Sequence, residues 1–221
     1  MTLSTSLRSA LASQGACAVG PFFDAKRTAL LCSEAEACFG RAEPMVLDEY
    51  QLGVGGQEMR SPVRLVVAEG DRLRETHESE QMVALASELA GRPMQPSHTA
   101  YLYYREGDFI GLHLDLPACE LTFLAGVDND APPLVVHPEL RGRSPEELLE
   151  LARATDGLPE GGVALPVAPG ALIALDGGVA PHHTPRHRPA GIASALASLC
   201  YVACAPPPPA SDAGNGGRIE R

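Results

Sequence analysis

The stretch Tyr101–Asp115 reads YLYYREGDFIGLHLD, and it decides the fold. Two apolar, aromatic-containing runs flank Gly107-Asp108, a turn signal, so the stretch predicts two strands joined by a turn. The second run ends in the triplet His113-Leu114-Asp115. Because residues two apart on a strand face the same side, His113 and Asp115 can present an imidazole nitrogen and a carboxylate oxygen side by side.

A second histidine-containing stretch, APHHTP at residues 180–185, can supply a third ligand from a distant strand. Two histidines and one carboxylate on one face would leave open positions on Fe(II) for a cosubstrate and O2. Zinc would more often take a closed tetrahedral site with thiolates, and no cysteine lies within two residues of the triplet. The structural alternative is that His113 is a hydrogen-bonded core histidine and that Asp115 begins a turn before Pro117.

The composition is that of a chain able to form one globular domain with a substantial core. It has 221 residues, of which 45% are hydrophobic. The formal net charge is −11 and Lys26 is the single lysine. This charge argues against a nucleic-acid or anionic-membrane partner, because such binding needs a basic surface. The expected partner is therefore a small-molecule substrate.

Cysteine usage and hydropathy suggest the compartment. The six cysteines match neither a zinc-binding framework nor a small disulfide scaffold, so free thiols in a reducing cytosol are expected. The N-terminus has no long apolar segment of the secretory type, and no apolar run reaches membrane-spanning length. A cytoplasmic location is therefore expected.

Periodicity and capping residues predict helices early in the chain and strands later. Helices are expected over residues 3–14, 24–39 and 76–90. A helical insertion with Ser144 as its N-cap is expected over about 144–154. The expected strands cover residues 63–68, 99–104, 109–114, 121–127, 134–137, 171–175 and 192–203.

Two segments are expected to lack regular structure. The glycine-spaced segment 41–62 could be a substrate lid or a plain surface loop. The tail over 205–221 is rich in proline, glycine and polar residues, so it is expected to be disordered.

The order of these parts resembles the Fe(II)/2-oxoglutarate-dependent dioxygenases, the prolyl 4-hydroxylase-like branch in particular. The residues that carry the resemblance are the run from Tyr104 to Asp115, the strands 121–127 and 133–138, the Pro-Gly turn and strand 169–175, and Pro181-His182-His183-Thr184. The resemblance covers roughly residues 95–204. It implies an α+β, mainly β fold, a double-stranded β-helix (jelly roll) with supporting N-terminal helices. A single oxygenase domain would span 1–204. Residues 1–94 would form a helical or mixed region that supports the jelly-roll core over 95–204.

The same resemblance assigns the site. It implies that His113, Asp115 and one histidine of the second stretch hold the iron. His182 is preferred because it lies two positions before the β-branched Thr184, and His183 is the alternative. Tyr104 resembles the tyrosine that hydrogen-bonds 2-oxoglutarate in this family.

The sequence departs from the family's pattern at one position, which concerns binding of the cosubstrate. The family places an arginine or lysine about ten residues after the distal histidine, where a guanidinium can pair with the far carboxylate of 2-oxoglutarate. Here that position falls on Ile192 or Ala193. Arg188 is the preferred substitute, with Arg186 and Arg105 as alternatives. His187 is expected to be a surface residue of the turn.

The resulting functional hypothesis is an Fe(II)- and 2-oxoglutarate-dependent oxygenase. It would use O2 to hydroxylate or otherwise oxidise an unactivated C–H bond of a small molecule, such as a natural-product or amino-acid intermediate. An alternative keeps the iron but lets the substrate chelate it directly, without 2-oxoglutarate. A second alternative is a jelly-roll binding protein with no enzymatic activity.

Overall fold

A long antiparallel sheet runs through nearly the whole chain. The computed structural model describes residues 5–52 and 59–205, and within them 11 strands pair in the order β1-β11-β8-β13-β6-β5-β7-β12-β9-β10, with β2 added beside β5. Their bounds are β1 Ala16–Pro21, β2 Glu43–Leu47, β5 Val63–Ala68, β6 Met94–Tyr104, β7 Phe109–His113, β8 Leu121–Gly126, β9 Leu134–Val136, β10 Val163–Leu165, β11 Ala171–Leu175, β12 His182–Thr184 and β13 Ser194–Ala203.

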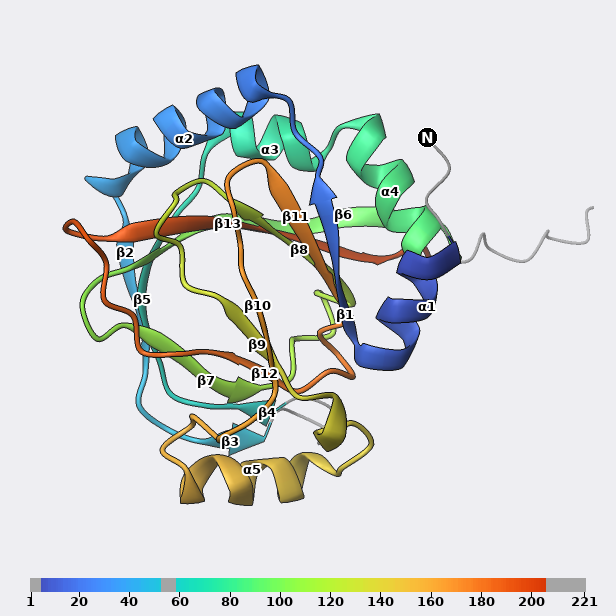
Figure 1. Ribbon diagram of the computed structural model, residues 1–221, viewed down its shortest axis with the longest axis vertical. Coiled ribbons are helices and arrows are strands. Elements are labelled where there is room, and N and C mark those ends of the chain that lie inside the picture. Colours follow the sequence, from blue (N-terminus) through green and yellow to red (C-terminus); the bar gives the residue numbers. More distant parts are fainter. Residues whose placement is uncertain (1–4, 53–58, 206–221) are drawn as a thin grey trace, which may run out of the picture.

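The sheet curls into two layers that face each other (Figure 1). β5 makes the corner, because Val66–Ala68 pair with β6 whereas Val63 and Arg64 pair with β7. β1, β11, β8, β13 and β6 form the layer on one side of this corner, and β7, β12, β9 and β10 form the other. This is the mainly β, double-stranded β-helix that the sequence predicts.

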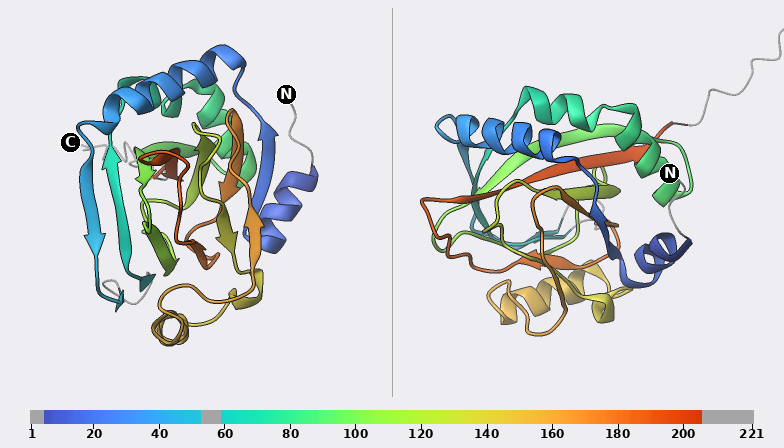
Figure 2. Two further views of the ribbon diagram at one scale, coloured as in Figure 1. Left: turned by 60° about the vertical axis from the view of Figure 1, so that its left-hand side comes forward. Right: turned by 45° about the horizontal axis from the view of Figure 1, so that its top comes forward.

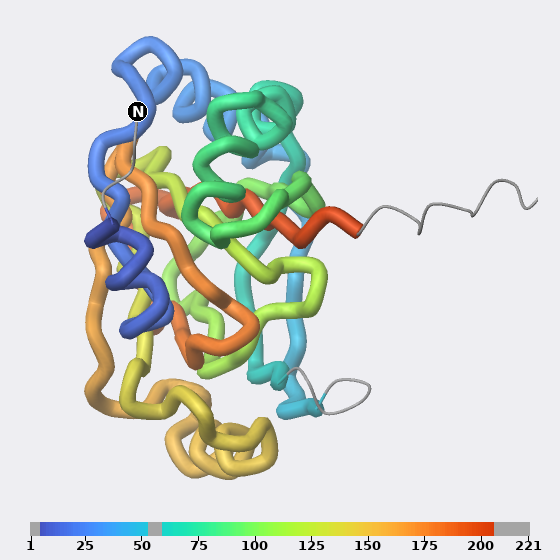
Figure 3. The backbone as a smooth tube through the Cα atoms, turned by 90° about the vertical axis from the view of Figure 1, so that its right-hand side faces the viewer, coloured from blue at the N-terminus to red at the C-terminus, as the bar shows by residue number. Residues whose placement is uncertain are grey.

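The helices α2, α3 and α4 cover the outer face of the first layer, and α1 packs at its edge beside β1 and α4 (Figure 2, Figure 3). Their bounds are α1 Thr5–Gln14, α2 Ala25–Phe39, α3 Asp71–His77 and α4 Glu80–Ala90. Apolar side chains from these helices pack against the outward-facing residues of β6 and β13, such as Tyr101 and Tyr201, which are fully buried. This helix-on-sheet cluster holds the first layer in place.

The helix expected over 76–90 is in fact two helices. Ser79 interrupts it, because its side chain accepts a hydrogen bond from the backbone N–H of Met82 and so begins α4 as an N-cap. α3 begins earlier than expected, since Glu34 of α2 accepts the backbone N–H groups of Arg72 and Leu73 at 2.8 and 2.9 Å. A contact distant in sequence therefore fixes this helix start.

The barrel interior is a second apolar cluster. It contains inward-facing side chains such as Leu124, Ile173 and Leu196 from the first layer, together with Val136 from the second. Because neighbouring residues of a strand face opposite sides, Leu196 lies in this cluster whereas Ala195 and Ala197 lie under the helices. Polar side chains inside this barrel therefore stand out against apolar surroundings.

α5, Pro145–Ala154, lies on the opposite side of the barrel from α2, α3 and α4 (Figure 1, Figure 2). Its buried Leu148 packs with Leu112 and Leu114, which alternate with His113 around the end of β7. The short strands β3 (Gln51–Leu52) and β4 (Met59–Arg60) lie beside it, and Met59 forms a bridge with Leu114. α5 therefore supports the strand that carries the His-x-Asp triplet.

The N-cap of α5 gives a first testable prediction. Ser144 and Glu147 form a complete capping box. Replacing Ser144 with alanine is expected to lower the free energy of unfolding by about 1 kcal/mol, whereas Ser144→Asp should preserve it, since aspartate caps equally well. Denaturant unfolding of the three proteins measures this. Equal stability of the alanine and wild-type proteins would contradict the role of the cap.

Five strands of the described residues were not anticipated, namely β1, β2, β3, β4 and β10. β1 follows Gly15 and pairs with β11, in a stretch where the sequence predicted no regular element. β2 occupies part of the segment 41–62 that was expected to be irregular, and it pairs with β5. Residues 53–58, within the segment that could be a lid or a plain surface loop, and residues 206–221 of the expected tail lie outside the described residues. Within the described part of the chain, no helix combines the length and apolarity that crossing a bilayer requires.

Candidate metal centre

An irregularity in strand pairing positions the first histidine. β12 pairs with β7 such that His182 lies opposite His113 and Thr184 lies opposite Ile110. Two steps along β12 thus match three steps along β7, which defines a β-bulge. Because of the extra residue, His113 and Ile110 face the same side as His182 and Thr184. The bulge therefore turns His113 into the barrel.

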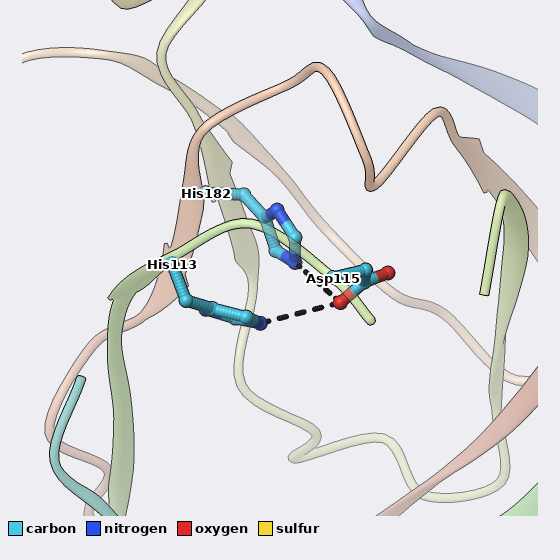
Figure 4. A group of neighbouring side chains, drawn as sticks. All are labelled: His113, Asp115 and His182. Carbon is cyan, nitrogen blue, oxygen red and sulfur yellow. Dashed lines mark ion pairs between the residues drawn. The ribbon is translucent and has the colours of Figure 1, made fainter. Parts of the chain in front are cut away.

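Three side chains converge at this point (Figure 4). His113 Nε2 lies 3.4 Å from Asp115 Oδ1, and His182 Nε2 lies 3.5 Å from the same oxygen. The two imidazole rings are 4.0 Å apart between centroids. One donor atom from each residue lies within 4.8 Å of the others, and no other group of three such donors occurs among residues 5–52 and 59–205.

Backbone carbonyls fix the orientation of both imidazoles. His113 Nδ1 lies 2.8 Å from the carbonyl oxygen of Gly111, and His182 Nδ1 lies 2.8 Å from that of Ala180. A carbonyl oxygen can only accept, so each Nδ1 carries the proton and each Nε2 keeps a free lone pair. Histidine ligands of metals are held in this way in general.

The carboxylate is also held from behind. Thr122 Oγ1 donates to Asp115 Oδ2 at 3.0 Å, which leaves Oδ1 facing the imidazoles. The backbone N–H of Asp115 donates to the carbonyl of Gly177 at 2.8 Å. A Cβ atom on Gly177 would lie 2.5 Å from Asp115 Cγ, so only glycine leaves space for the carboxylate there.

The protonation states suit metal binding. Burial alone would raise the pKa of Asp115, but the adjacent His182 and His113 hold this pKa well below its usual range. Burial, followed by repulsion from His113, lowers the pKa of His182. A carboxylate and neutral imidazoles are the forms that coordinate a cation.

The donor set fits Fe(II). Two imidazole nitrogens and one carboxylate oxygen lie on one face, the arrangement that leaves coordination positions of iron open. No thiolate belongs to the group, although Cys200 Sγ lies 3.6 Å from Thr122 Oγ1. A closed zinc site would instead use four protein ligands.

His183 points away from this group. It lies next to His182 on a three-residue strand, and its Nδ1 is 3.0 Å from Nε2 of the fully buried His137. His137 Nδ1 in turn lies 2.9 Å from Glu139 Oε1. Of the two histidines that the sequence left open, His182 is therefore the one brought to His113 and Asp115.

The residues predicted to bind the cosubstrate lie in different surroundings. Tyr104 is fully buried in the barrel, and its hydroxyl is 3.5 Å from Thr184 Oγ1, two residues beyond His182. Arg188 is exposed in the loop between β12 and β13. Its pairing with the far carboxylate of 2-oxoglutarate stays a prediction. Among the alternatives, Arg186 pairs with Asp156 at 2.8 Å and Arg105 with Asp108 at 2.9 Å.

The expectation that His187 is a surface residue was wrong. Its side chain is buried, and Nε2 forms a hydrogen bond with Ser194 Oγ at the start of β13. The backbone of His187 is bonded to Asp108 and Gly107 in the β6–β7 turn, at 2.9 and 2.8 Å, and this pairing draws the loop inward. Thr122 and Gly177 were likewise not singled out. The one available signal was a threonine within the otherwise apolar run 121–126.

Comparison with solved structures identifies the fold. An oxidoreductase of the 2OG-Fe(II) oxygenase family from Burkholderia pseudomallei matches with a TM-score of 0.63 and 15% identity, over 89% of both chains. AviO1 from Streptomyces viridochromogenes matches with a TM-score of 0.66 and 16% identity, over 94% of this chain and 99% of that one. The fold is that of the 2-oxoglutarate-dependent Fe(II) oxygenases.

A third structure with this oxygenase fold was solved with ligands. HygX from Streptomyces hygroscopicus, with nickel, 2-oxoglutarate and hygromycin B bound, matches with a TM-score of 0.62 and 13% identity, over 91% of this chain and 88% of that one. No protein-family model and no curated protein sequence matches the chain. The prolyl 4-hydroxylase-like branch stays a prediction within the oxygenase fold.

Proposed function

We propose that this protein is an Fe(II)- and 2-oxoglutarate-dependent oxygenase that oxidises a C–H bond of a small molecule. One observation carries the proposal: His113, Asp115 and His182 converge inside an oxygenase fold with both Nε2 lone pairs free. With its cosubstrate bound, such an iron centre activates O2 and oxidises an unactivated C–H bond.

The protein's own residues have defined tasks in this proposal. His113, Asp115 and His182 hold the cation on one face, and the carbonyls of Gly111 and Ala180 keep the two imidazoles in the ligating tautomer. Because His182 is 4% exposed, β12 and the apolar barrel interior shield this side of the centre from water. Substrate would approach from the side where His113 and Asp115 are partly exposed.

The substrate class follows from charge and from the fold neighbours. The net charge of −11 disfavours nucleic acid. The neighbours with this fold include HygX, solved with hygromycin B, and the epimerase SnoN, solved with nogalamycin RO. The molecules bound to these two neighbours support a natural-product intermediate as the substrate. An amino-acid intermediate is the other substrate class that the sequence-based hypothesis includes.

The test is cosubstrate turnover by metal-loaded protein. Protein prepared without oxygen and loaded with Fe(II) is mixed with 2-oxoglutarate and then exposed to O2, and succinate is measured with and without candidate natural products. Succinate that requires Fe(II) and increases with one candidate is the expected result. Protein that binds no iron would instead favour the non-enzymatic binding protein.

A second candidate keeps the iron and dispenses with 2-oxoglutarate. The observation in its favour is that none of the arginines, nor Lys26, is buried among residues 5–52 and 59–205. A substrate that chelates the iron itself would need no such cation. Oxygen consumption with substrate and Fe(II), in buffer free of 2-oxoglutarate and without succinate, would identify this candidate.

A further inference from the structure

A cluster of buried polar side chains lies in the barrel beyond the three metal donors. Its members are Tyr104 of β6, Thr184 of β12, Ser194 of β13 and His187 of the loop that joins β12 to β13. Each is at most 9% exposed. The surrounding interior is apolar, and polar groups in such surroundings are costly unless they have hydrogen-bond partners.

The strand register brings the cluster together. Ser194 lies directly opposite Tyr104 in the pairing of β13 with β6, so the two side chains share one face. His187 Nε2 is hydrogen-bonded to Ser194 Oγ, and its ring meets that of Tyr104 edge-on with 6.3 Å between centroids. The Tyr104 hydroxyl reaches across the barrel to Thr184.

The hydrogen-bonding capacity of the cluster is only partly used. The Tyr104 hydroxyl lies 3.5 Å from Thr184 Oγ1, well beyond the typical O–H···O distance of about 2.7–2.8 Å. Burial raises the pKa of Tyr104, so the phenol keeps its proton and remains a donor. Two hydroxyl groups at this distance could both donate to one anionic oxygen that lies to the side of the line joining them.

The cluster also contains a group that can become cationic. His187 is the only member with a basic nitrogen, and Arg188 beside it is exposed. Histidine is the residue whose charge changes most easily near neutral pH, and an adjacent carboxylate favours its charged form. A carboxylate in this cluster would therefore meet two or three hydroxyl donors and an imidazolium.

We propose that Tyr104, Thr184, Ser194 and His187 bind the far carboxylate of 2-oxoglutarate, with His187 in the role expected of an arginine or lysine. The inference rests on the proposed function. Thr184 lies two residues beyond His182, about 7 Å along the strand. A five-carbon 2-oxo diacid that chelates the metal through one end has the length to reach this point with the other.

The test compares two cosubstrates that differ only at that end. 2-Oxopentanoate has the same carbon chain as 2-oxoglutarate but a methyl group in place of the far carboxylate. Each acid is titrated anaerobically into Fe(II)-loaded protein, and the visible absorption of the chelate reports binding. Wild-type protein should bind 2-oxoglutarate about 10- to 100-fold more tightly, the factor expected for hydrogen bonds to a charged group.

Variants assign this preference to a residue. His187→Gln should reduce it to within about threefold of unity, because glutamine can bond Ser194 but carries no charge, and His187→Arg should restore it. Arg188→Gln, one residue along and exposed, is the matched control and should keep the wild-type preference. A preference that survives in His187→Gln, or one lost in Arg188→Gln, would overturn the assignment.

The same titration separates this inference from the proposed function. Equal binding of both acids by wild-type protein would overturn the carboxylate site while leaving an iron centre that chelates 2-oxo acids. Absence of a chelate with either acid would exclude 2-oxoglutarate as the cosubstrate, and the proposed carboxylate site would be excluded with it.

A pH series adds a readout that an arginine could not give. Burial lowers the pKa of His187, whereas Asp130 and Asp128 raise it, and the phenol ring of Tyr104 lies against the imidazole. Only protonated His187 attracts the carboxylate, so the preference for 2-oxoglutarate should fall as the pH rises through the pKa of His187 in the complex. In His187→Arg it should stay constant, and a constant preference in wild-type protein would contradict the role of His187.

Discussion

Replacing His182 with alanine is expected to weaken metal binding strongly and to abolish the proposed oxygenase activity. His182 supplies one of three donors, and its Nε2 lies 3.5 Å from Asp115 Oδ1. Loss of a group that merely supports a ligand typically costs 10- to 100-fold in metal affinity, so loss of a ligand should cost more than about 100-fold. Anaerobic titration with Fe(II), or with Co(II) as a spectroscopic substitute, measures this directly.

His183→Ala is the matched control, because it removes the neighbouring imidazole. His183 faces His137, so this variant should keep near-normal metal affinity while losing stability. The buried Nε2 of His137 would be left without its partner, at a cost of about 1–3 kcal/mol in the free energy of unfolding. If the alanine variant does not fold, His183→Gln offers a replacement hydrogen bond. Loss of metal from folded His183 variants, with metal retained in His182→Ala, would reverse the assignment.

Local sequence patterns were sufficient for the longer core strands and for proposing His113 and Asp115 as donors, whereas His182 was preferred over His183 only through the family resemblance. The His-x-Asp triplet follows an apolar run bounded by Gly107-Asp108, and these signals are read within a few residues. The capping box of Ser144 is equally local, and the helix over 145–154 was predicted from it. Elements predicted from such local patterns are found in the structure because local preference and tertiary packing favour the same conformation there.

What the sequence did not predict depends on contacts between distant residues. β1 is a strand because it pairs with β11, and α3 starts where Glu34 of α2 caps it. His187 looks like a polar turn residue in its sequence context, but hydrogen bonds to the β6–β7 turn draw it into the barrel. The bulge in β7 is defined only by its register with β12, so no pattern within β7 alone reveals it.

Gly177 shows how such a distant contact supports the centre, and it gives the second prediction of large effect. A Cβ atom at Gly177 would overlap the Asp115 carboxylate and lie 2.7 Å from Asp115 Cβ, too close for the side chain to remain in place. Gly177→Ala should therefore displace the carboxylate and reduce metal affinity by about 10- to 100-fold, as expected for a residue that orients a ligand. Anaerobic metal titration, alongside thermal unfolding, separates this effect from a loss of folding.

Gly178→Ala is the control for this variant, because a Cβ atom there meets nothing within 4 Å. It changes the same turn by the same methyl group and should bind metal like the wild type. The contrast between adjacent glycines isolates the position of the Asp115 carboxylate from general stiffening of the turn, since alanine restricts the backbone at both positions. Equal metal affinity in the two folded variants would mean that the carboxylate can move without loss of binding, and Asp115 would then not be a ligand held in a fixed position.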